Sequence, residues 1–333
     1  WTLVALASSG YFLVRFATLR PHLLSLALAL AVTWAATRRR TLLLAALCAL
    51  YPLSYTSFHL PLVLVAIVEA AHLACGGRPS WRVAAATVGG LALGVLAHPN
   101  FPQLLSFFWV VNVEVLGIAW ARDAAFEQGR EFLPLGLQNA LRHAAVPAAL
   151  ILAALVRAAR RRTAVELSFA LAAAAFLVLT FLSQRFLEYS APFAAVAGAL
   201  ALRDVRLRPA LVLLTALVWT AALGHKPVVR NASRTGPDID PRLAEVLRQR
   251  IPKGEQVFTC SWFFTGDFLL DLPDRRFIVA LDPVLFYVRD QARYREWFAL
   301  AHEARADAVD AVTGRFGARF VLCEKRDAYA PFL

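Results

Sequence analysis

The residues best suited to chemistry lie in or beside the loops between apolar stretches, and the strongest signal is at 184–189 (QRFLEY). Arg185 and Glu188 are three residues apart, so they can share one face of a helix. A guanidinium group in this place can bind a phosphate through two parallel hydrogen bonds. The simpler interpretation is that Arg185 and Glu188 pair with each other and anchor the end of a helix. Since ionisable residues at membrane depth often mark functional sites, both interpretations stay open.

Four other polar residues are weaker candidates for a binding or catalytic role. Arg15 could hold a lipid-linked phosphate, or its long side chain could reach the lipid headgroups. His59 lies in a polar break and His98 opens a long loop, so each could act as an acid or base, ligate a metal, or be a hydrogen-bonded structural residue. Glu131 stands beside Arg130, where a solvated ion pair is the default expectation.

Three ionisable residues fall inside apolar stretches, where they need partners. Glu69 and His72 lie one helical turn apart, and an interior hydrogen-bond role fits that spacing as well as proton transfer does. Glu166 follows Arg162 by four residues, so we expect an ion pair along one helix.

Nine apolar stretches must position these residues. A helix that crosses a bilayer needs about 20 mostly apolar residues, and several stretches are shorter, so we expect some to extend into their flanks or to stop part-way. Pro52 and Pro61 flank the polar break at 54–59, and broken backbone at membrane depth is tolerated only where it lines a cavity or packs on protein. The stretches are 1–16, 21–37, 41–53, 60–76, 83–97, 143–157, 164–182, 190–202 and 209–224.

Arginine clusters indicate how these stretches are oriented. Every second loop carries a cluster, which is the positive-inside pattern of a polytopic α-helical membrane domain of eight or nine spans. Residues 1–224 have a net charge of +10 and residues 225–333 of +2, so the basic character belongs to membrane loops and does not indicate nucleic acid as a partner. Loops 17–20, 52–60, 98–142 and 183–189 then face outside, together with everything after 224. The clusters are Arg38 to Arg40, Arg78 with Arg82, Arg157 with Arg160 to Arg162, and Arg203 with Arg206 and Arg208.

The segment 98–142 is too long and too mixed for a simple connection. It begins HPNFP, continues through an aromatic stretch at 107–109, and becomes charged at 122–131. We expect amphipathic helices that lie at the outer interface, with Trp109 and Trp120 at headgroup level.

After residue 224 the composition becomes that of a small extracytoplasmic α/β domain, residues 225–333. A polar linker at 225–241 precedes alternating helices and strands, an order typical of a parallel sheet. Asp267 and Asp282 fall near the carboxyl ends of predicted strands, where α/β sheets bind ligands, but there is no glycine-rich nucleotide-binding motif. We expect helices at 241–250, 290–303 and 305–316, a helical piece at 261–271, and strands at 255–260, 276–281 and 318–323.

Two cysteines, Cys260 and Cys323, each end a predicted strand. Adjacent strands would allow a disulfide in an oxidising compartment, but on geometry alone two buried thiols are favoured. None of the cysteines has metal-ligand spacing.

Short segments along most of the chain carry a resemblance to a known superfamily. They are 20–25 (RPHLLS), 98–102 (HPNFP), 129–134 (GREFLP), 185–189 (RFLEY) and, in the tail, Trp262 followed by 266–269 (GDFL) and 278–282 (IVALD). With these segments the chain resembles bacterial membrane proteins of the GT-C glycosyltransferase superfamily, related to the dolichyl-phosphate-mannose mannosyltransferases and the aminoarabinose transferases.

The resemblance implies an enzyme of the bacterial inner membrane that takes a sugar from a polyprenyl-phosphate donor and works on the outer face. Arg185 is then a phosphate contact, with Arg15 as second choice, and the leaving phosphate is stabilised by a preorganised guanidinium. The presumed catalytic carboxylate of the superfamily lies in the first outer loop, so we expect it upstream of Trp1. A divalent metal stays open as a cofactor, although no ligand spacing supports one. The expected partners are membrane lipid, the lipid-linked sugar and an acceptor that the sequence does not identify.

Two other functions compete with glycosyl transfer. One is a non-catalytic membrane protein that moves or assembles lipid-linked glycans, as a flippase or scaffold. A transporter should show paired discontinuous helices in two related halves, whereas one clear break, near 52–60, is predicted here. The other is a receptor with an outer sensing domain, for which a cytoplasmic signalling segment would be expected.

Overall fold

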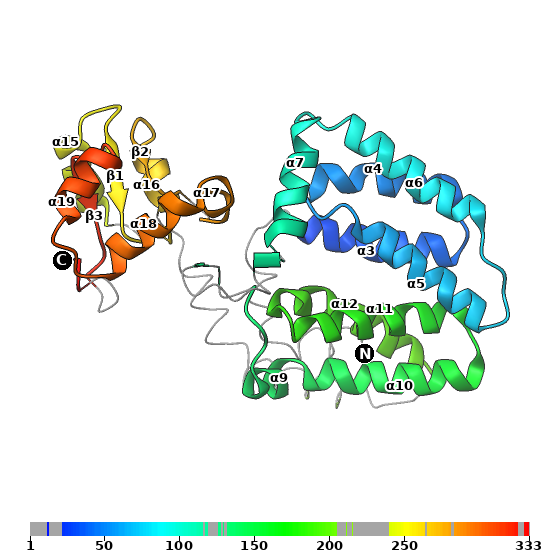
Figure 1. Cartoon of the computed structure of the whole chain (residues 1–333). Coiled ribbons are helices and arrows are strands. Elements are labelled where there is room, and N and C mark those ends of the chain that lie inside the picture. Colours follow the sequence, from blue (N-terminus) through cyan, green and yellow to red (C-terminus); the bar gives the residue numbers. More distant parts are fainter. Residues whose placement is uncertain are drawn as a thin grey trace. The chain divides into compact units, whose positions relative to one another are not determined.

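The computed structural model describes most of the chain as two compact units (Figure 1). The first unit comprises 1–108 and 129–233, and the second comprises 109–128 and 234–333. The predicted domains kept all of 98–142 with the helical domain, whereas residues 109–128 group with the second unit. The described residues are Phe12, 22–115, Gly117, Ile118, Phe126, Glu127, Gly129, 132–204, Leu211, Thr215, 240–263, 265–280, 283–325 and 330–332.

The first unit is built from apolar helices, and seven of them match predicted stretches. These are α3 (His22–Thr37), α4 (Thr41–Ser54), α5 (Leu60–Ala74), α6 (Trp81–Leu96), α10 (Ala145–Arg161), α11 (Ala164–Thr180) and α12 (Leu187–Leu202). From the long loop this unit also contains α7 (Gln103–Trp109), apart from its last residue, and α9 (Leu137–His143), whereas the π-helical turn η1 (Val110–Glu114) belongs to the second unit. A short 3₁₀ turn, η3 (Gln184–Phe186), joins α11 to α12. The predicted stretches 1–16 and 209–224 lie outside the described residues, apart from Phe12, Leu211 and Thr215.

The seven helices are short for membrane spans, with 14 to 17 residues each. In the described part of the chain, no single helix has both the length and the apolar character needed to cross a membrane. One bent pair, α9 with α10 at 65°, meets the requirement by length and composition. The structure therefore establishes a helical unit followed by an α/β unit, and the eight or nine spans stay a prediction.

Small residues let these helices pack closely. Gly90 and Gly94 of α6 are one turn apart and face α4. A Cβ at Gly90 would come within 2.3 Å of the Ala45 carbonyl oxygen, and one at Gly94 within 2.1 Å of the Ala49 carbonyl oxygen. The two backbones can therefore touch only because both positions lack a side chain.

The described arginines of the predicted clusters lie at the turns on one side of the bundle. Ser25 at the start of α3 hydrogen-bonds to Tyr189 at the start of α12, with 3.1 Å between the hydroxyl oxygens. Arg185, just before α12, lies over the ring of Tyr55, which follows the end of α4. Since these helix ends lie together, the other ends of α3, α4, α11 and α12 must lie together on the opposite side of the bundle, and each of those ends carries an arginine cluster.

A three-stranded parallel sheet forms the centre of the second unit, as the alternating pattern predicts. The strands are β1 (Gln256–Thr259), β2 (Arg276–Phe277) and β3 (Phe320–Leu322), in the order β2-β1-β3. Val257 is opposite Phe277 on one side and Phe320 on the other. The helices are α15 (Pro241–Arg250), α16 (Thr265–Asp271), α17 (Val284–Arg289), α18 (Gln291–His302) and α19 (Ala308–Asp310), followed by the π-helical turn η4 (Ala311–Arg315).

Local signals explain where two of these helices start. The Asp240 carboxylate accepts a hydrogen bond of 2.8 Å from the Arg242 backbone N–H, and Pro241 occupies the first helical position of α15. Asp290 caps α18 in the same way, through the Arg293 backbone N–H at 3.0 Å. The short helix α17 was not predicted, because its residues fall between a predicted strand and a predicted helix.

The helices cover both faces of the sheet, because successive strand residues point in opposite directions. Val257 packs with residues of α15 and α16, including Leu247 and Phe268. Phe258 packs with residues of α17, α18 and η4 around the fully buried Trp297. The Trp297 indole N–H donates a hydrogen bond of 2.7 Å to the Thr259 carbonyl, which fixes α18 to the end of β1.

Cys260 and Cys323 form a disulfide, so the prediction of two buried thiols is wrong. The pairing of β1 with β3 sets Thr259 opposite Leu322, and each cysteine directly follows the last residue of its strand. Their Cα atoms lie 5.0 Å apart, within the range that a disulfide spans. The sequence could not decide this because strand adjacency is a long-range property.

Part of the long loop is fastened to the second unit. The Phe126 ring packs edge-on against Tyr287, with 4.9 Å between ring centroids. The Glu127 backbone N–H donates to the Tyr294 hydroxyl at 3.0 Å, and its carboxylate lies 3.4 Å from His302 Nε2. The hydrogen bond to Glu127 raises the pKa of His302 above its ordinary value. These contacts explain why 109–128 belong to the second unit.

Candidate functional site

Arg185 lies at the helix ends opposite the arginine clusters and is flanked by two aromatic rings. Its guanidinium carbon is 5.6 Å from the centroid of Tyr55 and 5.2 Å from that of Phe132. Both distances are in the range of cation–π contacts. The residue is half-buried, and among the described residues no carboxylate lies within ion-pair distance of its guanidinium. A positive charge held in this way can still accept an anionic ligand.

The break between α11 and α12 positions Arg185. Ser183 has extended backbone angles, and the single turn η3 follows it. Two backbone hydrogen bonds tie this turn to the end of the long loop: Gln184 N–H to the Leu133 carbonyl at 2.9 Å, and Leu135 N–H to the Thr180 carbonyl at 3.4 Å. These bonds hold the neighbouring Phe132 over Arg185.

The break after α4 positions the other ring. Tyr55 has extended backbone angles (φ −159°, ψ 142°), while its N–H still donates to the Tyr51 carbonyl at 3.1 Å. The expected break at 54–59 is therefore present, and it packs on protein. Sequence reasoning missed Tyr55 and Phe132 as partners of Arg185, although both lie in segments that it singled out.

Glu188 lies one turn from Arg185 but does not pair with it. The Glu188 side chain is buried at the start of α12, and no ion pair joins the two residues in the described part of the chain. The alternative interpretation, in which Arg185 and Glu188 anchor the helix end together, is therefore not what the structure contains. Beneath the turn, the buried ring of Tyr189 stacks on Phe176 at 5.1 Å between centroids.

The two candidate histidines stand at the ends of apolar helices. His59 directly precedes α5, and its ring meets Phe108 edge-on at 5.5 Å. Phe108 in turn stacks on Phe58 at 4.5 Å. His98 follows α6, and its Nδ1 accepts a hydrogen bond of 3.1 Å from the Asn100 backbone N–H. That bond gives His98 a structural role in its own loop.

Of the remaining candidates, only Asp267 lies within the described residues. Arg15 and Glu131 lie outside the described residues, as does Asp282 of the α/β unit. Asp267 lies in the first turn of α16.

At the other end of the bundle, ionisable residues pair with one another. Glu69 accepts a hydrogen bond of 2.6 Å from Arg39 and one of 2.9 Å from the Ser80 backbone N–H. Its carboxylate therefore has the hydrogen-bond partners that its position in an apolar stretch requires. Glu166, which is buried, lies 3.6 Å from Arg157 and 3.4 Å from Arg203. The predicted pair of Glu166 with Arg162 is wrong.

The reason for that error is geometric. Arg162 ends α10 in the left-handed conformation, with φ 49°, so it does not continue into the helix that carries Glu166. Glu166 instead faces the ends of two neighbouring helices, α10 and α12.

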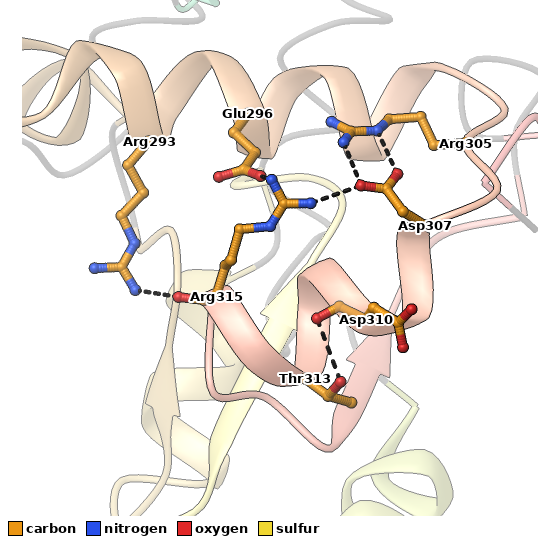
Figure 2. Close-up of polar contacts among 7 residues, drawn as sticks. All are labelled: Arg293, Glu296, Arg305, Asp307, Asp310, Thr313 and Arg315. Atoms are coloured by element: carbon orange, nitrogen blue, oxygen red, sulfur yellow. Dashed lines mark hydrogen bonds and ion pairs between the residues drawn. The ribbon is translucent and has the colours of Figure 1, made fainter.

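Figure 2 shows a paired arginine cluster in the second unit. Arg305 donates two hydrogen bonds to Asp307, of 2.9 and 2.7 Å, and Arg315 contacts both Asp307, at 2.6 Å, and Glu296. Arg293 donates to the Arg315 carbonyl at 2.9 Å. Arg305 holds the pKa of Asp307 below its ordinary value. These guanidinium groups already have acceptors and join α18 to η4, so we assign them a structural role.

Neither a metal-binding group nor a similar protein adds evidence about the site. Across the described ranges, no group of three or more His, Cys, Asp or Glu side chains could hold a metal ion. Comparisons with protein-family models and with curated protein sequences found no match.

Proposed function

We propose that the chain is a GT-C-like membrane glycosyltransferase, which moves a sugar from a polyprenyl-phosphate donor to an extracytoplasmic acceptor. The observation that carries the proposal is the half-buried Arg185, held between Tyr55 and Phe132 with no described carboxylate within ion-pair distance. Arg185 binds the phosphate of the donor. As the bond from sugar to phosphate breaks, negative charge grows on the phosphate, and a fixed guanidinium stabilises it.

The two rings contribute to this chemistry. They cover faces of the guanidinium group and reduce its contact with water, so its interaction with a phosphate is strengthened. They also restrict the side chain to one place, which lowers the entropy lost when the phosphate binds.

Packing of the helical unit supports a membrane location. Its interior is rich in alanine and glycine and holds polar side chains such as Ser25 and Glu166, while large apolar residues such as Leu152 and Val178 are exposed. This distribution is typical of helices whose outer surfaces contact lipid and whose small residues allow close approach. Helices of 14 to 17 residues rise about 21–26 Å, and arginine side chains at their ends can reach the headgroups across the mismatch.

Two independent features support the proposed orientation. The described arginines of the clusters lie on one side of the bundle, and they favour the cytoplasmic surface for that side. The disulfide between Cys260 and Cys323 favours an oxidising compartment for the α/β unit. A reporter fused after residue 162 should therefore respond as cytoplasmic, and one fused after residue 230 as extracytoplasmic. Equal responses from both fusions would contradict the orientation.

The proposed activity is tested by sugar transfer in vesicles that contain the full-length protein and a polyprenyl-phosphate sugar. Arg185→Ala should lower transfer by roughly 10²- to 10³-fold, the range for loss of one preorganised charge donor. Arg142→Ala is the control, because Arg142 is an exposed arginine of the same unit, in α9. Equal transfer by both variants would remove Arg185 from the site. If the wild-type protein binds the donor but transfers no sugar, the flippase or scaffold function replaces the enzyme.

A further inference from the structure

We propose that the turns before helices α4 and α6 form a discrete binding site for an anionic phospholipid. The inference rests on the membrane location in the proposed function, and it adds a lipid site at the end of the bundle opposite Arg185. This surface, the α4–α6 basic patch, is formed by Arg38, Arg40, Arg78 and Arg82 together with the rings of Trp34 and Trp81.

Hydrogen bonds bring the two turns of the patch together. Arg39 lies in the turn between α3 and α4, and its guanidinium donates a hydrogen bond of 3.0 Å to the Arg78 carbonyl in the turn between α5 and α6. It also donates one of 2.6 Å to Glu69, whose carboxylate accepts another of 2.9 Å from the Ser80 backbone N–H. These bonds fix the two turns to each other, so the arginines that flank them lie in one patch.

Helices α4 and α6 also start on the same side of the bundle (Figure 1). Gly90 packs against Ala45, and Gly94 packs against Ala49, so the two helices run in the same direction. Neither helix has an acidic residue in its first turn or a side chain that caps its start. The positive ends of two helix dipoles therefore add to the charge of the arginines.

The patch is strongly basic, and the described protein leaves most of its charge unneutralised. Residues 22–108 contain five arginines, no lysine and a single carboxylate, that of Glu69, which already pairs with Arg39. The four arginines of the patch are exposed, and no described carboxylate lies within ion-pair distance of them. An anionic partner can therefore bind here without displacing an internal ion pair.

Two tryptophans hold arginines of the patch and place apolar surface beside them. The Arg40 guanidinium lies over the Trp34 ring, 5.0 Å from its centroid, and that of Arg82 lies over the Trp81 ring at 5.8 Å. Trp81 is 75% exposed, and Leu42 in the first turn of α4 is 88% exposed. A phospholipid matches this combination, because it joins a phosphate to apolar chains in one molecule. A soluble anion would leave the apolar surface in water.

A second copy of the chain is a poorer partner than lipid. Copies inserted in the same orientation would meet with the same side of the bundle at the same membrane surface. The described carboxylates on that side, Glu69, Glu166 and Asp204, each already pair with an arginine. A two-fold contact through the patch itself would oppose like charges. Anionic headgroups of the surrounding leaflet therefore supply the counter-charge.

The test counts the lipid molecules that stay bound to the full-length protein. The protein in a neutral detergent is titrated with phosphatidylglycerol or, in parallel, with phosphatidylcholine, and native mass spectrometry records each adduct. The test variant carries Arg40→Glu and Arg82→Glu. The matched control carries Arg160→Glu and Arg162→Glu, which change two exposed arginines on the same side of the bundle, at the end of α10. Both variants therefore lose the same charge from the same side.

We expect one phosphatidylglycerol molecule to bind before any other lipid and more tightly than phosphatidylcholine. Arg40→Glu with Arg82→Glu should weaken this binding by at least about 25-fold, since each basic residue near an anionic surface contributes roughly a 5-fold preference. The control variant should bind like the wild type. Thermal unfolding of both variants in the same detergent should match the wild type, because all four side chains are exposed.

Equal weakening by the two double variants would show a diffuse attraction to the basic side and would overturn the site, as would equal binding of the two lipids. A dimer that forms in place of the lipid adduct, and that the test variant loses, would make a second copy the occupant and also overturn it. Sugar transfer by a wild-type protein that retains no phosphatidylglycerol would overturn this inference alone. A retained phosphatidylglycerol without sugar transfer would overturn the proposed enzyme alone, and a protein that stays in solution without detergent would overturn both.

Discussion

Arginines that join helices at one end of the helical unit are paired with carboxylates, whereas the half-buried Arg185 at the other end is not. Arg40 and Arg82, also at the first end, are exposed and lie over the rings of Trp34 and Trp81. At one end, Arg39 pairs with Glu69, and Arg157 and Arg203 surround the buried Glu166. At the other end, Arg185 meets aromatic rings, and no described carboxylate pairs with it. A guanidinium that is neutralised within the protein mainly holds helices together. One that is held but not neutralised keeps its charge available for a ligand, which is why we assign function to Arg185.

The largest effect is expected when the guanidinium group of Arg185 is replaced by another positively charged group. Arg185→Lys keeps the positive charge but loses the planar group that can lie against two rings and bind a phosphate at two points. We expect sugar transfer by this variant to fall by roughly 10²-fold, the lower end of the range for loss of one preorganised donor, while its thermal unfolding in detergent matches the wild type. Full activity would show that a point charge suffices and that the rings have no part in the site.

The next largest effect concerns stability at the paired end. Glu166→Ala leaves Arg157 and Arg203 without this carboxylate, and we expect the free energy of unfolding to fall by about 2 kcal/mol, because Arg203 is half-exposed and water offsets part of the loss. Chemical unfolding in detergent micelles measures the change. Arg160→Ala, an exposed residue of the same cluster, should have little effect. Once corrected for the folded fraction, transfer should be unchanged; a specific loss of transfer would break the division between the two ends.

A smaller effect is expected where the long loop meets the second unit. Protonated His302 pairs with Glu127, and this hydrogen bond raises the pKa of His302 above its ordinary value of 6.5. A raised pKa stabilises the folded contact below pH 6.5, and that contribution is lost as the pH rises through the folded-state pKa. The protection factors of the Phe126 and Glu127 amides, which are exchange rates corrected for the intrinsic pH dependence of amide exchange, should therefore be higher at pH 5.5 than at pH 8. His302→Gln should remove the pH dependence, and an unchanged difference would show that the pair does not fasten the loop.

The smallest effect is expected in the paired cluster of Figure 2. Asp307→Asn removes the carboxylate that Arg305 and Arg315 share on the protein surface. Because Arg305 lowers the pKa of Asp307, the contribution of this pair is present at neutral pH and disappears as the pH falls through the folded-state pKa. The decrease in thermal stability should be slight and should vanish at high salt. A decrease larger than that of Glu166→Ala would contradict the ranking of the two clusters.

Local patterns predicted much of the fold. Seven apolar stretches are helices, and apart from the unpredicted α17 the order of strands and helices in the second unit is as expected, because periodicity and caps are encoded by neighbouring residues. Long-range relations were missed or wrong. The disulfide depends on strand adjacency, the partners of Glu166 depend on how three helices meet, and the attachment of 126–127 depends on the fold of a distant segment.

The site was predicted to a similar extent. Arg185 could be singled out from the local sequence, because a charged residue between two apolar stretches requires a structural or functional reason. Its two rings come from segments 130 and 53 residues away, so only the folded chain brings Tyr55 and Phe132 to it. His98, which looked equally suited to chemistry, makes a hydrogen bond within its own loop.

Direct binding of a short-chain polyprenyl monophosphate tests the central claim, that Arg185 holds the phosphate of a lipid-linked ligand. Binding to the full-length protein is compared for the wild type, Arg185→Ala and the exposed control Arg142→Ala at low and high salt. We predict that Arg185→Ala weakens binding by at least roughly 10-fold, as expected for loss of a charge-assisted hydrogen bond, while Arg142→Ala binds like the wild type. Equal affinity for all three proteins would contradict the assignment of Arg185 and the function built on it.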